Sequence, residues 1–181
     1  IGNPPYGAKL TDEHKRIFKQ VYESAKTKDG LKGSIDTYSL FIDKGLSLCS
    51  SSAILAYIIP ISVGSSDSAS QLHKILFESC SEIWFSSYSE RPKKIFDNAE
   101  QSVAIIVCKK NNVPLKHLWT TKINKRYADE QSVQDVIDNL QFVDSSKYLK
   151  RGRFPKIGSA IDLRILEKIT KIPKKLTDFI S

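Results

Sequence analysis

The residues best suited to chemistry lie near the start of the chain and read Asn3-Pro4-Pro5-Tyr6. Proline fixes φ at about −65°, carries no N–H and pushes the preceding residue into extended backbone. The loop therefore presents carbonyl acceptors without a neighbouring donor, together with the side-chain oxygen of Asn3 and the flat ring of Tyr6. Two acceptors that take both hydrogens of an exocyclic NH2 draw its nitrogen toward a tetrahedral form, and this frees the lone pair for attack.

Two other interpretations of these four residues are a structural Pro-Pro turn and a proline-rich ligand for a WW-type module. Such ligands usually carry a spacer between the prolines and the tyrosine, which Pro5-Tyr6 lacks. At ordinary residue usage, about 5% for proline, the tetrapeptide is expected by chance in fewer than about one in a thousand chains of this length. We therefore favour catalysis.

Apolar periodicity predicts the elements that must position this loop. Helices are expected over residues 12–26, 36–48, 70–80, 132–143 and 159–172, and strands over 53–60, 82–88, 102–110 and 117–123. Helix caps are expected at Thr11, at Ser34 or Asp36, and at Ser159. This order predicts an α/β sheet with helices on its faces. Two closely spaced strands near the end predict one antiparallel strand in an otherwise parallel sheet.

Composition and length describe an ordinary soluble domain. The chain has 181 residues, of which 40% are hydrophobic and 27% charged, enough for one well-packed domain. Its longest apolar run, residues 53–61, is far shorter than the roughly 20 residues that cross a bilayer, so we expect no membrane contact. The spacing of cysteines and histidines predicts neither disulfides nor a metal site, and that of the cysteines suits reduced thiols in a cytoplasmic protein. These residues are Cys49, Cys80, Cys108, His14, His73 and His117.

Positive charge concentrates toward the end of the chain. The net charge is +8, of which residues 147–181 carry +7, with ten basic and three acidic side chains. The stretch 150–156 includes Arg151, Arg153 and Lys156 beside an aromatic residue, a composition that suits contacts along a nucleic-acid backbone. A solvated linker is an equally open interpretation.

Asn3-Pro4-Pro5-Tyr6 resembles the signature of adenine-specific DNA methyltransferases that use S-adenosylmethionine and belong to restriction-modification systems. Residues 35–63 resemble the segment that follows this signature in the family, which is a Tyr/Phe-bearing helix, a turn and a strand ending in proline. Residues 91–110 resemble its later motif, in which a phenylalanine precedes the antiparallel strand. The matches keep the family's order, so the resemblance implies an α/β fold with the later strands of a Rossmann-like methyltransferase sheet.

The resemblance implies catalytic roles for three residues. Asn3 and the Pro4 carbonyl would accept hydrogen bonds from the target amino group. Tyr6 would stack on an adenine swung out of the duplex, because the reacting atom is otherwise inside the base stack.

Further residues are assigned by the same resemblance. Phe96 would contact the flipped base from its edge or other face. Phe41, with Pro5 nearby, would line the adenine pocket of the cofactor S-adenosylmethionine.

The resemblance also implies what these residues lack. The family's glycine-rich turn and acidic cofactor-binding residues would lie upstream of Ile1. The chain also starts with Ile1 and contains no methionine, so we expect it to be a piece of a larger protein. We therefore expect residues 1–112 to be the C-terminal half of a catalytic domain and 113–181 a basic extension or linker toward a target-recognition domain. The expected partners are double-stranded DNA, the missing N-terminal half and a target-recognition domain or specificity subunit. We expect this piece alone to be inactive.

Two other functions remain open. Protein glutamine N5-methyltransferases that act on release factors share the Asn-Pro-Pro-Tyr signature, because a side-chain amide poses a similar problem. Those chains end soon after the last strand, whereas about 70 residues follow Lys110 here and turn basic. A non-catalytic DNA-binding module of a modification complex is the second alternative. We favour methyl transfer to the N6 amino group of adenine in DNA.

Overall fold

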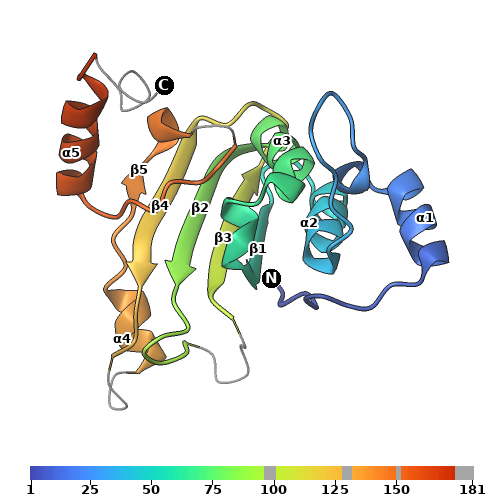
Figure 1. Cartoon of the computed structure of the whole chain (residues 1–181), viewed down its shortest axis with the longest axis horizontal. Coiled ribbons are helices and arrows are strands. Elements are labelled where there is room, and N and C mark those ends of the chain that lie inside the picture. Colours follow the sequence, from blue (N-terminus) through green and yellow to red (C-terminus); the bar gives the residue numbers. More distant parts are fainter. Residues whose placement is uncertain (96–100, 128–131, 150–151, 174–181) are drawn as a thin grey trace, which may run out of the picture.

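A computed structural model describes residues 1–95, 101–127, 132–149 and 152–173 of the chain. Within them the fold is a mixed α/β arrangement, with one five-stranded sheet of order β1-β3-β2-β4-β5 (Figure 1). The strands are β1 (Ile54–Pro60), β2 (Cys80–Tyr88), β3 (Val103–Lys110), β4 (His117–Asn124) and β5 (Val143–Asp144). The predicted α/β class is confirmed, and so are the four strands expected from periodicity.

Strand directions define one edge of this sheet. Strand β3 pairs antiparallel with β1 on one side and with β2 on the other, while β2 and β4 run parallel. The carboxyl ends of β1, β2 and β4 therefore share one edge, which we call the carboxyl edge. The sequence predicts one antiparallel strand, and β3 has this role. The short β5, antiparallel to β4, adds a pairing that the sequence does not predict.

Two of the three predicted helix caps form. The Thr11 hydroxyl accepts from the His14 N–H and the Ser159 hydroxyl from the Asp162 N–H, so both predicted starts are confirmed. Asp36 directly precedes the second helix, but its side chain makes no capping hydrogen bond. The helices are α1 (Asp12–Val21), α2 (Thr37–Leu48), α3 (Ser70–Ser79), α4 (Val133–Asp138) and α5 (Ala160–Thr170).

Two predicted helices end earlier than expected. The helix expected over residues 12–26 ends at Val21, because the Ser24 N–H donates to the Asp43 carboxylate of α2 over 2.8 Å. The helix expected through residue 143 ends with α4, and the chain then turns to pair β5 with β4. Both differences arise from tertiary contacts, which cannot be predicted from the apolar periodicity of the sequence.

Helices α2 and α3 pack on the sheet and enclose the core. Figure 1 shows both helices beside β1, with α1 farther out and α5 at the opposite end, beyond β5. Fully burying a large apolar side chain contributes about 1.5–3 kcal/mol, so this core stabilises the packing of α2 and α3 on the sheet. Its fully buried members include Ile42, Leu72, Leu76, Ile83 and Phe85.

Phe154 joins this core from a segment far along the chain. Its ring lies 4.9 Å from that of Phe85 in an edge-to-face contact, and the residue is only 5% exposed. The Phe154 N–H donates to the Gly64 carbonyl over 2.7 Å. Residues 152–158 therefore lie against the sheet and are not a solvated linker. A functional boundary at residue 112 stays a prediction.

Candidate active site

The first residues of the chain extend the sheet beyond β1. The Gly2 N–H donates to the Ala56 carbonyl over 2.9 Å, and the Ile58 N–H donates to the Gly2 carbonyl over 3.1 Å. The bridge with Tyr57 is parallel, so the chain leaves the sheet at the carboxyl edge. Asn3-Pro4-Pro5-Tyr6, which we call the proline loop, thus stands at the edge where open α/β sheets bind their ligands.

The proline loop folds back so that Tyr6 reaches β1. Tyr6 Oη lies 2.8 Å from Asn3 Oδ1 and 2.9 Å from the Ile58 carbonyl oxygen, so its one proton is shared between two acceptors. Pro4 is buried, Asn3 is exposed and Tyr6 is half-buried. Burial raises the pKa of Tyr6, so its hydroxyl remains a donor at neutral pH. Asn3 Oδ1 keeps a second lone pair for another donor.

The side chain of Thr37, which lies outside the proline loop, binds the loop at Pro5. Thr37 Oγ1, on the first residue of α2, donates to the Pro5 carbonyl over 2.5 Å, and Thr37 is only 7% exposed. This hydrogen bond fixes the loop against the start of α2. No local sequence pattern points to Thr37, because 32 positions separate it from Pro5.

An apolar hollow lies beside the start of α2. It holds about 190 Å³ and is lined by Leu10, Phe18, Tyr22, Thr37, Leu40, Phe41 and Lys44. Phe41 is 47% exposed and lies one turn after Thr37 on the same side of α2. Phe41 is thus part of a pocket wall, and Pro5 is linked to that pocket through its hydrogen bond with Thr37.

The remaining predicted site residues lie elsewhere. Phe96 and Arg151 fall outside the described residues. Arg153 Nη2 lies 2.9 Å from Asp67 Oδ1 in an exposed ion pair. Lys156 is exposed farther along the same segment. The structure therefore brings together Asn3 and Tyr6, and it gives Arg153 an acidic partner of its own.

Comparison with known proteins places this arrangement in a family. The family described as Eco57I restriction-modification methylase matches residues 1–96, more than half of the chain. The chain belongs to this family of restriction-modification methylases. It is also 30% identical over 138 residues to the Type II methyltransferase M.AccI of Acinetobacter calcoaceticus, covering 75% of this chain and 23% of that protein. The chain thus spans about a quarter of the length of this curated relative.

Solved structures share the fold of this chain. The ATP-dependent Type ISP restriction-modification enzyme LlaBIII bound to DNA superposes with a TM-score of 0.60 at 16% identity, covering 90% of this chain and 13% of that one. The modification subunit of a putative type I restriction enzyme from Vibrio vulnificus YJ016 gives 0.57 at 12% identity, covering 91% and 38%. These similarities show that the mixed α/β fold of the chain is shared with parts of both structures.

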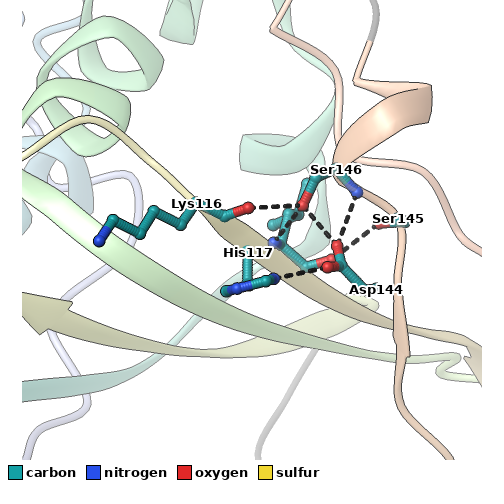
Figure 2. A network of polar contacts seen from close by, with 6 residues as sticks. Lys116, His117, Asp144, Ser145 and Ser146 are labelled. Carbon is teal, nitrogen blue, oxygen red and sulfur yellow. Dashed lines mark hydrogen bonds and ion pairs between the residues drawn. The ribbon is translucent and has the colours of Figure 1, made fainter.

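A second polar cluster lies at the opposite edge of the sheet, where β4 begins (Figure 2). His117 Nδ1 lies 2.6 Å from Asp144 Oδ2, and the Ser146 N–H donates to Asp144 Oδ1 over 3.0 Å. Partial burial raises the pKa of Asp144, but hydrogen bonds from His117 and Ser146 outweigh burial and hold that pKa below its usual value. The Ser146 hydroxyl bonds the carboxylate, not the imidazole, so the contacts are not those of a Ser-His-Asp triad. The cluster ties β5 to β4.

In the described part of the chain, the groups that could do chemistry are the Asn3 amide oxygen, the Tyr6 ring and the hollow beside α2. Within this described part, no group of three or more His, Cys, Asp or Glu side chains could hold a metal ion. None of its helices combines the length and apolar character that crossing a bilayer requires. The proline loop and the hollow beside α2 are therefore the candidate site.

Proposed function

We propose that this chain serves in methyl transfer from S-adenosylmethionine to the N6 amino group of an adenine in double-stranded DNA. The geometry of the proline loop carries the proposal: an exposed Asn3 amide and a half-buried Tyr6 ring stand at the carboxyl edge, anchored to β1 and α2. Membership in a family of restriction-modification methylases supports the same reaction.

The proline loop acts on the target nitrogen through two acceptors. Asn3 Oδ1 accepts one hydrogen of the adenine amino group, and the Pro4 carbonyl accepts the other. The nitrogen is drawn toward a tetrahedral form, and its lone pair forms the new N–C bond as the S–C bond of the methyl donor breaks. One amino proton then leaves to solvent. The Tyr6 hydroxyl, 2.8 Å from Asn3 Oδ1, keeps the Asn3 amide in one orientation.

Tyr6 also supplies the surface for the base. The adenine must leave the duplex to react, and stacking on an aromatic ring is worth about 1–3 kcal/mol. The hydrogen bond from Tyr6 Oη to the Ile58 carbonyl holds the ring in place. We assign the opposite edge or face of the base to Phe96, which lies outside the described residues.

The hollow beside α2 fits the adenine ring of S-adenosylmethionine, because its lining is mostly apolar and aromatic. When bound, this cofactor supplies an electrophilic methyl group on a sulfonium. Phe41 would wall the pocket, and Thr37 would hold Pro5 next to it. The ribose and methionine contacts are assigned to an N-terminal half outside residues 1–181, so these residues alone would not turn over.

The remaining parts of the proposal concern organisation. Residues 1–112 serve as the later half of a catalytic domain, and 113–181 lead toward a target-recognition domain or specificity subunit. Arg151, Arg153 and Lys156 would contact DNA phosphates. The relative LlaBIII was solved bound to DNA, which supports DNA as the partner here.

The test is transfer of label by the full-length protein from tritiated S-adenosylmethionine to duplex DNA. We expect Asn3→Ala to lower turnover by about 10²–10³-fold, as loss of one transition-state contact does elsewhere, while duplex affinity stays the same. Label on a release factor but not on DNA would favour the glutamine methyltransferase instead. Unchanged turnover in Asn3→Ala would contradict the role of the amide.

A further inference from the structure

Two loops at the carboxyl edge form one surface. Residues 89–95 follow β2 and residues 125–127 follow β4. The Ser89 N–H donates to the Asn124 carbonyl over 2.9 Å, and the Lys93 N–H donates to the Arg126 carbonyl over 3.2 Å. These backbone hydrogen bonds hold the two loops side by side, so we name them together the basic loop pair.

Positive charge dominates the basic loop pair and the end of β4. One acidic side chain, Glu90, accompanies six basic ones within residues 90–94 and 122–127: Arg91, Lys93, Lys94, Lys122, Lys125 and Arg126. The Arg91 side chain is 88% exposed even though it lies 3.8 Å from the Glu90 carboxylate. Lys94, Lys122 and Lys125 are exposed as well. Asp135, on the neighbouring α4, caps its own helix by accepting from Ser132.

A hollow with a mixed polar and apolar lining deepens this surface. It holds about 360 Å³ between the end of β4 and α4. Its lining residues are Lys122, Ile123, Asn124, Lys125, Tyr127, Asp135, Val136 and Asn139. Ammonium, phenol and amide groups are donors that bind phosphate and sugar oxygens. Lys122 and Lys125 therefore give the rim of this hollow donors for phosphate oxygens, while the Asp135 carboxylate is engaged by Ser132.

The basic loop pair lies on the same edge as the proline loop. The segment at Gly2 pairs with β1, and the sheet continues through β3 and β2 to β4. With strands about 4.8 Å apart, the ends of β2 and β4 lie roughly 14 and 19 Å along the edge from the proline loop. A duplex presents a phosphate charge about every 1.7 Å of its axis, so one that delivers a base to Tyr6 also covers this distance with phosphates.

We propose that the basic loop pair is a binding site for DNA backbone phosphates beside the target adenine, with Lys94 and Lys125 as its principal contacts. The proposal rests on the proposed function, because DNA is its ligand. It goes beyond that function by placing the duplex along the carboxyl edge, across β2 and β4. Arg153, by contrast, already has the Asp67 carboxylate as a partner.

The experiment compares two double variants of the full-length protein. Lys94→Gln/Lys125→Gln removes charge from the basic loop pair. Lys116→Gln/Lys147→Gln is the matched control, since both lysines are exposed and lie at the opposite edge, where β4 begins and β5 ends. Binding of a fluorescein-labelled DNA duplex is measured by anisotropy across a potassium chloride series, without cofactor.

We expect the first variant to flatten the slope of log K against log salt by about 0.9 per lost phosphate contact, or about 1.8 in total. The control keeps the original slope, and melting curves confirm that both variants are folded. An unchanged slope in Lys94→Gln/Lys125→Gln, or an equal change in the control, overturns the proposal. A protein that shows the expected slopes but transfers no methyl group supports the binding site and refutes the proposed reaction. A protein that binds no duplex refutes both.

Discussion

One hydroxyl group joins the two parts of the candidate site. Thr37 Oγ1 donates to the Pro5 carbonyl, and the same residue lines the hollow together with Phe41. A helix transmits small displacements along its length, because its backbone hydrogen bonds resist bending. A ligand in the hollow would therefore contact Thr37, and Thr37 holds the proline loop that carries Asn3 and Tyr6.

We expect Thr37→Val to lower kcat for methyl transfer by about 10- to 100-fold, because an error of about 1 Å in placing a reacting group has this effect. KM for DNA should change little, since no DNA contact is assigned to Thr37. The free energy of unfolding should fall by only about 0.5–1.5 kcal/mol, the usual net value of one hydrogen bond.

Thr37→Ser is the control for this substitution, because it keeps the hydroxyl and removes a methyl group. Steady-state kinetics and urea unfolding of the three proteins provide the comparison. Equal losses of kcat in the serine and valine variants would show that the hydroxyl is not the group that matters.

At the scale of elements, α2 is tied to the fold by a buried phenol. Tyr38 is only 6% exposed, and its hydroxyl lies 3.3 Å from the Asp36 carboxylate that precedes the helix. Burial first, and then the charge of Asp36, raise the pKa of Tyr38 to about 12. The folded chain therefore keeps this proton at a pH where an unfolded tyrosine has lost it.

The expected consequence is alkaline instability. An unfolded tyrosine ionises near pKa 10, so the contribution of Tyr38 is complete below about pH 10. It is lost as the pH rises toward about 12, because the unfolded chain releases the proton first. We expect the urea midpoint to fall across this window, and Tyr38→Phe to reduce the fall. Some alkaline instability should remain in the variant, because burial also raises the pKa of Tyr88. If the urea midpoint of Tyr38→Phe fell with pH as steeply as that of the unsubstituted protein, Tyr38 would not contribute to the alkaline instability.

Local patterns predicted the types of these elements well, and long-range contacts explain what they missed. Apolar spacing and caps such as Thr11 and Ser159 are local signals, and the corresponding helices are present. The helix expected over residues 12–26 ends early because Asp43 captures the Ser24 N–H. The family signature likewise identified residues 3–6 as the candidate site. It did not identify Thr37, which lies 32 positions from its hydrogen-bond partner Pro5. The backbone hydrogen bond that joins residues 89–95 to 125–127 was not predicted either, because its partners are also far apart in the sequence.

At the scale of the whole molecule, a late segment completes the core of an earlier one. Phe154 packs edge-to-face on Phe85 of β2 and lies 5.7 Å from Phe77 of α3, measured between ring centroids. Thr120 of β4 donates to the Ile157 carbonyl over 3.0 Å. The segment therefore bridges α3, β2 and β4.

We expect Phe154→Ala to lower the free energy of unfolding by about 3–5 kcal/mol, the usual cost of removing a buried phenylalanine side chain. Phe142→Ala is the matched control, because Phe142 is 36% exposed and should lose far less. Urea unfolding followed by tryptophan fluorescence measures both. Similar losses in the two variants would contradict the place of Phe154 in the core.

The packing of residues 152–158 through Phe154 also determines where the chain tolerates cleavage or insertion. Gly152 has a positive φ of 75° and lies against the ring of His73, so the turn into the bridge is shaped by its neighbours. A protease that cleaved between residues 152 and 158 would release an aromatic ring from the interior and admit water beside Phe85. Tags, fusions and truncations belong outside this stretch, because Phe154 packs on Phe85 of β2 and the Ile157 carbonyl accepts from Thr120 of β4.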